Sequence, residues 1–247
     1  MAANPPAQAS FEVTHEKAPS KSVIAGFSSF GLAGLTAVDY LTKQLELSQT
    51  GHITTRELPS ITPFESGTPR HHTRLFSRPE ADVTALVNEL FVPVWAADPF
   101  SEAVLDWADA SGVQEITILS GVPVPHGPEQ HQTYYVATED YQATHLRDTP
   151  VQPMGNGFLD GVNASLVGQG IDSDLRVGVL LTPVHAQAPD AEAALRLVDT
   201  VEQVFDLDLD TSALEEFAAE VEQYYRELAA RLEDVDRDYA SEDRMFM

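Results

Sequence analysis

A buried strand, a glycine-rich turn and a helix follow one another at residues 22–45, and this unit constrains the fold more than any other stretch. Residues 22–25 read Ser-Val-Ile-Ala, a short, mostly apolar run typical of a strand covered on both faces. The large apolar residues that come next recur at helical spacing: Leu32, Leu35, Val38, Leu41 and Leu45. A strand followed directly by an amphipathic helix is typical of α/β proteins.

The turn inside this unit raises the question of a phosphate site, because helix N–H groups point outward at such turns. Its glycines, Gly26, Gly31 and Gly34, fit neither G-x-G-x-x-G nor the P-loop, and no lysine follows at the Walker position. We therefore favour the interpretation that the small residues let the helix pack closely on its sheet. A nucleotide loop is the alternative.

Strand and helix patterns alternate along the middle of the chain. This order predicts a three-layer α/β fold, with a central mainly parallel or mixed sheet, helices on both faces and a C-terminal helical appendage. Strands are expected at 11–15, 22–26, 51–58, 70–77, 83–90, 114–120, 133–138 and 174–181. Helices are expected from Asp98, after the second glycine corner through Ala164 to Gly168, from Pro189 and from Asp210. We divide the chain into a loose N-terminus (1–10), the α/β domain (11–205), a helical segment (206–238) and a tail (239–247).

Two proline-rich stretches, 58–69 and 123–128, interrupt these elements. Proline cannot donate to a strand ladder, so both stretches are expected to be stiff loops. Two interpretations have equal weight. The loops either shape a protein-binding surface or stop edge strands from extending.

The charge balance is strongly acidic, with 39 Asp and Glu against 14 Lys and Arg and a net charge of −25. Acidic residues occur in every helical segment, which favours a surface adapted to high salt over a local acidic face for a basic partner. Binding to nucleic acid is disfavoured. The chain has no cysteine, no apolar run near the roughly 18 residues of a membrane span and no signal peptide, so we expect a cytoplasmic protein.

No enzyme signature stands out. His126 and His131 share one loop and are expected to approach His185, but no H-E-x-x-H pattern supports a metal. Adjacent His71 and His72 on a strand would face opposite sides. Ser28 and Ser29 lack the G-x-S-x-G context of a nucleophile.

The chain ends on Met245-Phe246-Met247, after an acidic, polar run. Three large apolar residues at an exposed end are a liability unless a partner receives them. A free carboxylate beside an aromatic ring suits a pocket that contains a lysine. A terminus that packs back on its own domain is the alternative.

Several of these stretches together resemble the PAC2 family, in a haloarchaeal version. The marks are the corner at residues 26–34, Ser120-Gly121-Val122-Pro123, the second glycine corner at 155–161 and the helix that begins at Pro189-Asp190. Ser28 and Ser29 depart from the small or proline residues usual in the family. The resemblance implies a fold similar to purine nucleoside phosphorylase without its catalytic residues, no cofactor and a homo-oligomer, from trimer to pentamer.

Some archaeal family members resemble proteasome-assembly chaperones and carry a C-terminal hydrophobic–Tyr–any tripeptide that docks between proteasome α subunits. Met245, Phe246 and Met247 match this tripeptide with Phe in place of Tyr. The resemblance thus implies a non-enzymatic proteasome-binding protein. One alternative is a nucleoside- or phosphate-binding protein or enzyme with a cleft at Gly26, Phe27, Ser28, Ser29, Gly31, Gly121, His126, Gly155, Asn156 and Gly157. The other is a structural homo-oligomer with a buried tail.

Overall fold

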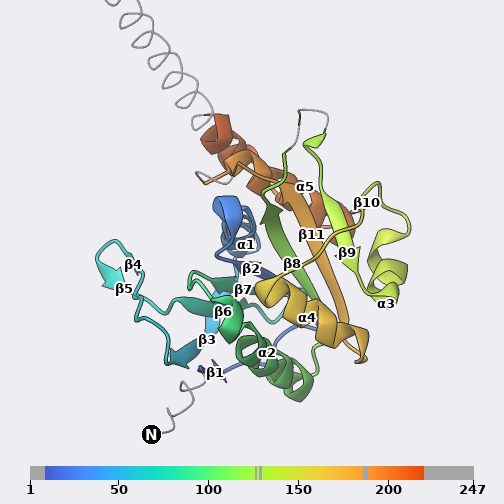
Figure 1. The fold of residues 1–247 in the computed structure, drawn as a ribbon. Coiled ribbons are helices and arrows are strands. Elements are labelled where there is room, and N and C mark those ends of the chain that lie inside the picture. The colour runs from blue at the N-terminus through green and yellow to red at the C-terminus, as the bar shows by residue number, and fades with distance from the viewer. Residues whose placement is uncertain (1–8, 126, 128–129, 186–188, 220–247) are drawn as a thin grey trace, which may run out of the picture.

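The computed structural model describes residues 9–125, 127, 130–185 and 189–219. Its main element is a nine-stranded sheet in the order β1-β3-β6-β7-β2-β8-β11-β9-β10. The strands are β1 (Ser10–His15), β2 (Ser22–Phe27), β3 (Ser48–Arg56), β6 (Thr73–Ser77), β7 (Val83–Asn88), β8 (Glu115–Val122), β9 (Tyr134–Ala137), β10 (Gln152–Pro153) and β11 (Arg176–Pro183). Figure 1 shows β2, β8 and β11 crossing its centre.

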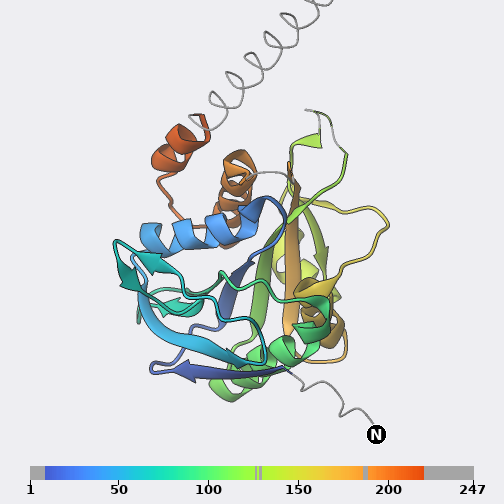
Figure 2. The same ribbon diagram turned by 60° about the vertical axis from the view of Figure 1, so that its left-hand side comes forward.

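Helices cover both faces of this sheet. On one face lie α1 (Ala33–Gln44) and α5 (Ala191–Phe205), and on the other lie α2 (Ala97–Ser111) and α4 (Gly161–Ile171) (Figures 1 and 2). Successive residues of β2 point to opposite faces, so Ile24 packs with α1 and α5 while Val23 and Ala25 pack with α2 and α4. Each face thus has its own apolar core, which confirms the predicted helix–sheet–helix layering.

The sheet is mixed, which is one of the two arrangements expected, and it is not mainly parallel. Four of its eight strand pairings are parallel and four are antiparallel. The parallel block is β7-β2-β8-β11, whereas β1, β3 and β6 extend it in antiparallel order. The short turn at 78–82 leaves no room for a crossover, so β6 and β7 must be antiparallel.

Two local expectations differ from the structure. The stretch 58–69 contains a small hairpin of β4 (Phe64–Glu65) and β5 (Thr68–Pro69). Helix α2 begins after a 3₁₀ turn at Val94–Ala96, so Asp98 lies inside its first turn and does not cap it. The Asp98 carboxylate instead accepts a hydrogen bond from Ser165 Oγ on α4 at 2.8 Å.

The last described residues, 212–219, are helical and follow Thr211, whose carbonyl accepts from the N–H groups of Leu214 and Glu215. Leu209 and Leu214 belong to the same apolar core as α1 and α5, and Ala218 is also buried. The remainder of the predicted helical segment, and the tail with Met245, Phe246 and Met247, lie outside the described residues. Across the described residues, no helix has the length and apolar character needed to cross a membrane.

Candidate functional site

The first glycine corner seats α1 on the sheet. A Cβ at Gly26 would overlap the carbonyl oxygen of Gly34, and a Cβ at Gly34 would overlap the carbonyl oxygen of Leu119 on β8. Gly31 has a φ of +65°, the left-handed region that favours glycine. The close approach of helix and sheet therefore requires these glycines, which confirms the packing interpretation.

A cavity of about 540 Å³ opens beside this corner, at the carboxyl ends of the parallel strands β2, β7 and β8. Open α/β sheets place ligand crevices at this edge. The walls come from five segments: the turn after β2, the chain after β7, the end of β8, the start of α4 and Pro189 before α5. The lining residues are Phe27–Leu32, Asn88, Leu90, Phe91, Val92, Val94, Ser120, Gly121, Asp160–Asn163 and Pro189.

The structure gathers half of the predicted cleft residues at this cavity. Phe27, Ser28, Ser29, Gly31 and Gly121 line it. Gly26 lies beneath α1 instead, where it packs against Gly34.

The second glycine corner does not contribute in the way that was expected. Gly155, Asn156 and Gly157 are exposed and are not among the lining residues; the chain reaches the cavity only from Asp160 onward. His126 lies outside the described residues.

The cavity is mostly apolar, and Asp160 is the single charged residue among the described residues that line it. Several of its polar side chains are hydrogen-bonded within the protein: Asn163 Nδ2 donates to Ser120 Oγ at 3.0 Å, and Asn88 Oδ1 accepts from Thr73 Oγ1 on β6 at 2.6 Å. Ser29 Oγ is buried without a hydrogen-bond partner. A phosphate would meet a carboxylate here and no cation from the lining, so the lining suits a neutral, apolar occupant.

Large apolar side chains continue from the cavity onto the surface. Phe30, Phe91, Val94 and Trp95 are 52%, 67%, 71% and 60% exposed. The first three also line the cavity, and Trp95 follows Val94 in the 3₁₀ turn before α2. Sequence analysis missed this rim. The signal was the run Phe91-Val92-Pro93-Val94-Trp95, too apolar for an ordinary exposed connection.

Four histidines form two ring pairs, and none of the four is among the residues that line the cavity. The His131 and His185 rings lie 6.1 Å apart, as the loop argument expected, and His185 Nδ1 lies 3.0 Å from Asp190 Oδ2. His71 stacks on His52 with 3.7 Å between ring centroids, whereas the neighbouring His72 lies 2.8 Å from Thr73 Oγ1. No group of three or more His, Cys, Asp or Glu among the described residues is arranged to hold a metal ion.

Asp190 has a structural task at the start of α5. Its carboxylate accepts from the N–H groups of His185 and Ala193, each at 2.9 Å. Burial raises the pKa of this carboxyl, but these hydrogen bonds and the bond from the His185 ring outweigh burial and lower it. Asp190 is thus the N-cap of α5, the helix predicted to begin at Pro189-Asp190.

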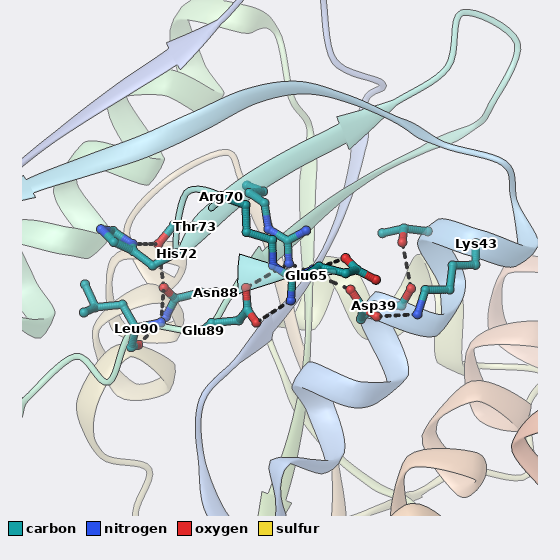
Figure 3. A network of polar contacts seen from close by, with 11 residues as sticks. Asp39, Lys43, Glu65, Arg70, His72, Thr73, Asn88, Glu89 and Leu90 are labelled. Carbon is teal, nitrogen blue, oxygen red and sulfur yellow. Dashed lines mark hydrogen bonds and ion pairs between the residues drawn. The ribbon is translucent and has the colours of Figure 1, made fainter. Parts of the chain in front are cut away.

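A second polar feature is the ion-pair network in Figure 3, which ties the β4–β5 hairpin to the sheet. Arg70, directly after β5, pairs with Glu65 of the hairpin and, at 2.9 Å, with Glu89. Arg74 on β6 pairs with the other oxygen of Glu89 at 2.9 Å and lies 3.9 Å from Asp39 on α1. Sequence analysis did not identify this network.

Proteins of known family and known structure are similar to this chain. The sequence matches the PAC2 family over residues 23–229. The chain belongs to the PAC2 family. No curated protein sequence matches it.

Solved structures share the PAC2 fold of this chain. Pyrococcus furiosus PbaA, an archaeal homologue of proteasome-assembly chaperone, is 17% identical, with a TM-score of 0.80 over 98% of this chain and 100% of that one. P. furiosus PbaB, an archaeal proteasome activator, is 18% identical, with a TM-score of 0.73 over 89% and 99%. A Thermoplasma acidophilum protein of unknown function is 21% identical, with a TM-score of 0.73 over 90% of each chain.

Proposed function

We propose that this PAC2 protein is a non-enzymatic proteasome-assembly chaperone or proteasome-binding factor that works as a homo-oligomer. The observation that carries the proposal is the match of nearly the whole chain, in family and in fold, to proteins that include a chaperone homologue and a proteasome activator. The partner is the α ring of the proteasome.

The contact we propose is the C-terminal tripeptide. Phe246 enters a pocket between α subunits, Met245 covers its apolar edge and the terminal carboxylate of Met247 pairs with a lysine. An aromatic anchor in a desolvated pocket is typical of a binding hot spot. The Met247 side chain corresponds to the position at which the family tripeptide accepts any residue, so it contributes little beyond its carboxylate.

Capture of purified α subunits tests this contact. Full-length protein is expected to retain α subunits, and protein without residues 245–247 is expected to lose them. Phe246→Tyr, which restores the hydroxyl of the family tripeptide, is expected to bind at least as well as the natural chain. Equal capture by the full-length and truncated proteins would overturn tail docking.

The nucleoside alternative, with its analogy to purine nucleoside phosphorylase, stays a prediction. The apolar lining around Ser29 favours a neutral nucleoside over a phosphorylated ligand. Thermal shift in high salt with a nucleoside and with inorganic phosphate separates the two ligands. Stabilisation by phosphate alone would contradict the electrostatic argument.

A further inference from the structure

Two surfaces of this acidic chain are apolar and nearly free of charge. The first, which we call the arm, is residues 58–69, with the β4–β5 hairpin at its centre. Phe64 and Ile61 on the arm are 73% and 44% exposed. The single charged residue of the arm, Glu65, is paired with Arg70. The second, which we call the mouth, is the cavity beside the first glycine corner together with its rim of Phe30, Phe91, Val94 and Trp95.

The arm projects from the body of the molecule yet is held in place at its base. Figure 1 shows β4 and β5 standing away from the main sheet, and the two strands pair with each other. Arg70 N–H donates to the Pro63 carbonyl at 2.9 Å, and the Arg70 side chain bridges Glu65 to Glu89. Glu89 is anchored in turn by Arg74, whose side chain is 6% exposed. Phe64 is thus exposed on a hairpin that is fixed at its base, which lowers the conformational entropy lost on binding.

The mouth has the composition of a protein contact. Exposed aromatic residues surround a cavity with one charged lining residue, Asp160, in a chain where 21% of residues are charged. A small molecule in the cavity would leave Trp95 uncovered, because Trp95 is not among the lining residues. A protein segment would cover both the cavity and the rim.

We propose that the mouth receives the arm of a second copy of this chain, with Phe64 entering the cavity and Ile61 covering the rim. Two molecules of net charge −25 repel each other, and the repulsion is smallest where the facing surfaces are free of charge. The arm and the mouth are formed by different residues, so the contact is head-to-tail, the type that builds a ring when the rotation between neighbours closes. The inference rests on the homo-oligomer of the proposed function and names its self-contact. Its test does not involve the proteasome, so the two proposals can fail separately.

The chain supplies its own reporter for this contact. It has two tryptophans: Trp107, buried on α2, and Trp95, 60% exposed at the mouth. Sedimentation and tryptophan emission are measured together on the full-length protein in molar KCl as its concentration rises. We expect assembly accompanied by a blue shift of Trp95 emission. Single substitutions Phe64→Ser on the arm and Phe91→Ser at the mouth are each expected to weaken assembly by about 30-fold or more.

Ile171→Ser is the matched control, because Ile171 is 70% exposed at the end of α4, away from both surfaces. It should assemble like the natural chain. All three positions are exposed, so circular dichroism should show intact folding.

Mixing the two defective variants tests the head-to-tail geometry. The Phe64→Ser chain keeps its mouth and the Phe91→Ser chain keeps its arm, so an equimolar mixture should form heterodimers. A monomeric natural chain with unshifted Trp95 emission would overturn the proposal. So would a mixture that fails to pair, or loss of assembly in Phe91→Ser but not in Phe64→Ser, which would mean that another segment or molecule occupies the mouth.

Discussion

Glu115 is a buried carboxylate with three side-chain hydrogen-bond donors. It lies at the start of β8, where its carboxylate accepts hydrogen bonds from Ser22 Oγ, from His145 Nε2 at 2.8 Å and from Arg176 Nε at 3.0 Å. Burial alone raises the pKa of Glu115, but the bonds from His145, Ser22 and Arg176 outweigh it and lower the pKa to about 2 from 4.5. These partners link the starts of β2, β8 and β11 to the helical segment that carries His145.

We predict that Glu115→Gln lowers the free energy of unfolding at pH 7 by about 3 kcal/mol, the order of magnitude that this pKa shift implies. Because the folded-state pKa is below the unfolded value, the contribution is complete above pH 4.5 and disappears as the pH falls toward 2. Urea unfolding at pH 7 and in this acidic window measures the difference.

The exposed Glu102→Gln on α2 is the control for Glu115→Gln and should change stability little. This account of Glu115 would be contradicted if the difference in unfolding free energy between the natural chain and Glu115→Gln stayed constant from neutral to acidic pH.

At the scale of elements, the contact between α1 and the sheet is set by two glycines. Gly34→Ala would place its Cβ against the Leu119 carbonyl, so the helix must move away from β8. We predict a destabilisation of about 3 kcal/mol or more in urea unfolding.

Gly168→Ala in α4 is the matched control, since a Cβ there meets nothing within 4 Å. It should stabilise the helix by about 0.5–1 kcal/mol. Equal effects of the two substitutions would contradict the packing argument.

Helices and strands long enough to show a repeating apolar pattern were predictable from the sequence. Two-residue strands and the relative direction of neighbouring strands were not. The spacing from Leu32 to Leu41 marked α1, and the apolar runs marked β2 and β8. The two-residue strands β4, β5 and β10 are too short to carry a period. Strand direction leaves no local pattern either, apart from the turn at 78–82, whose length requires an antiparallel pair.

At the candidate site, the residues at strand ends were predictable from the sequence, whereas the exposed rim between elements was not. Glycines and serines at the end of β2 and at Gly121 mark a strand-end crevice, and these residues do line the cavity. The rim at Phe91–Trp95 lies between elements, where no periodic signal exists. The ion pairs of Arg70 and Arg74 depend on tertiary contacts with Glu89 and Asp39, which sequence spacing does not reveal.

At the scale of the whole molecule, the net charge of −25 predicts a strong dependence on salt. The Debye length shrinks from about 10 Å at 0.1 M to about 3 Å at 1 M, so molar KCl screens the repulsion between surface carboxylates. We expect the thermal midpoint to rise as KCl is raised to molar concentrations. A parallel series with sucrose at matched osmolarity separates the screening of charges by KCl from the stabilisation caused by a solute that is excluded from the protein surface. A midpoint that is insensitive to KCl would contradict the high-salt interpretation of the composition.

The central claim, a PAC2 protein that engages the proteasome through its last three residues, is tested most directly by affinity for the isolated α ring. The comparison is between Phe246→Ala and Met247→Ala in the otherwise natural chain, at one high salt concentration. The account predicts at least about a 30-fold weaker affinity for Phe246→Ala, the loss expected of an aromatic anchor, and little change for Met247→Ala. Equal affinities of the natural chain and Phe246→Ala for the α ring would contradict it.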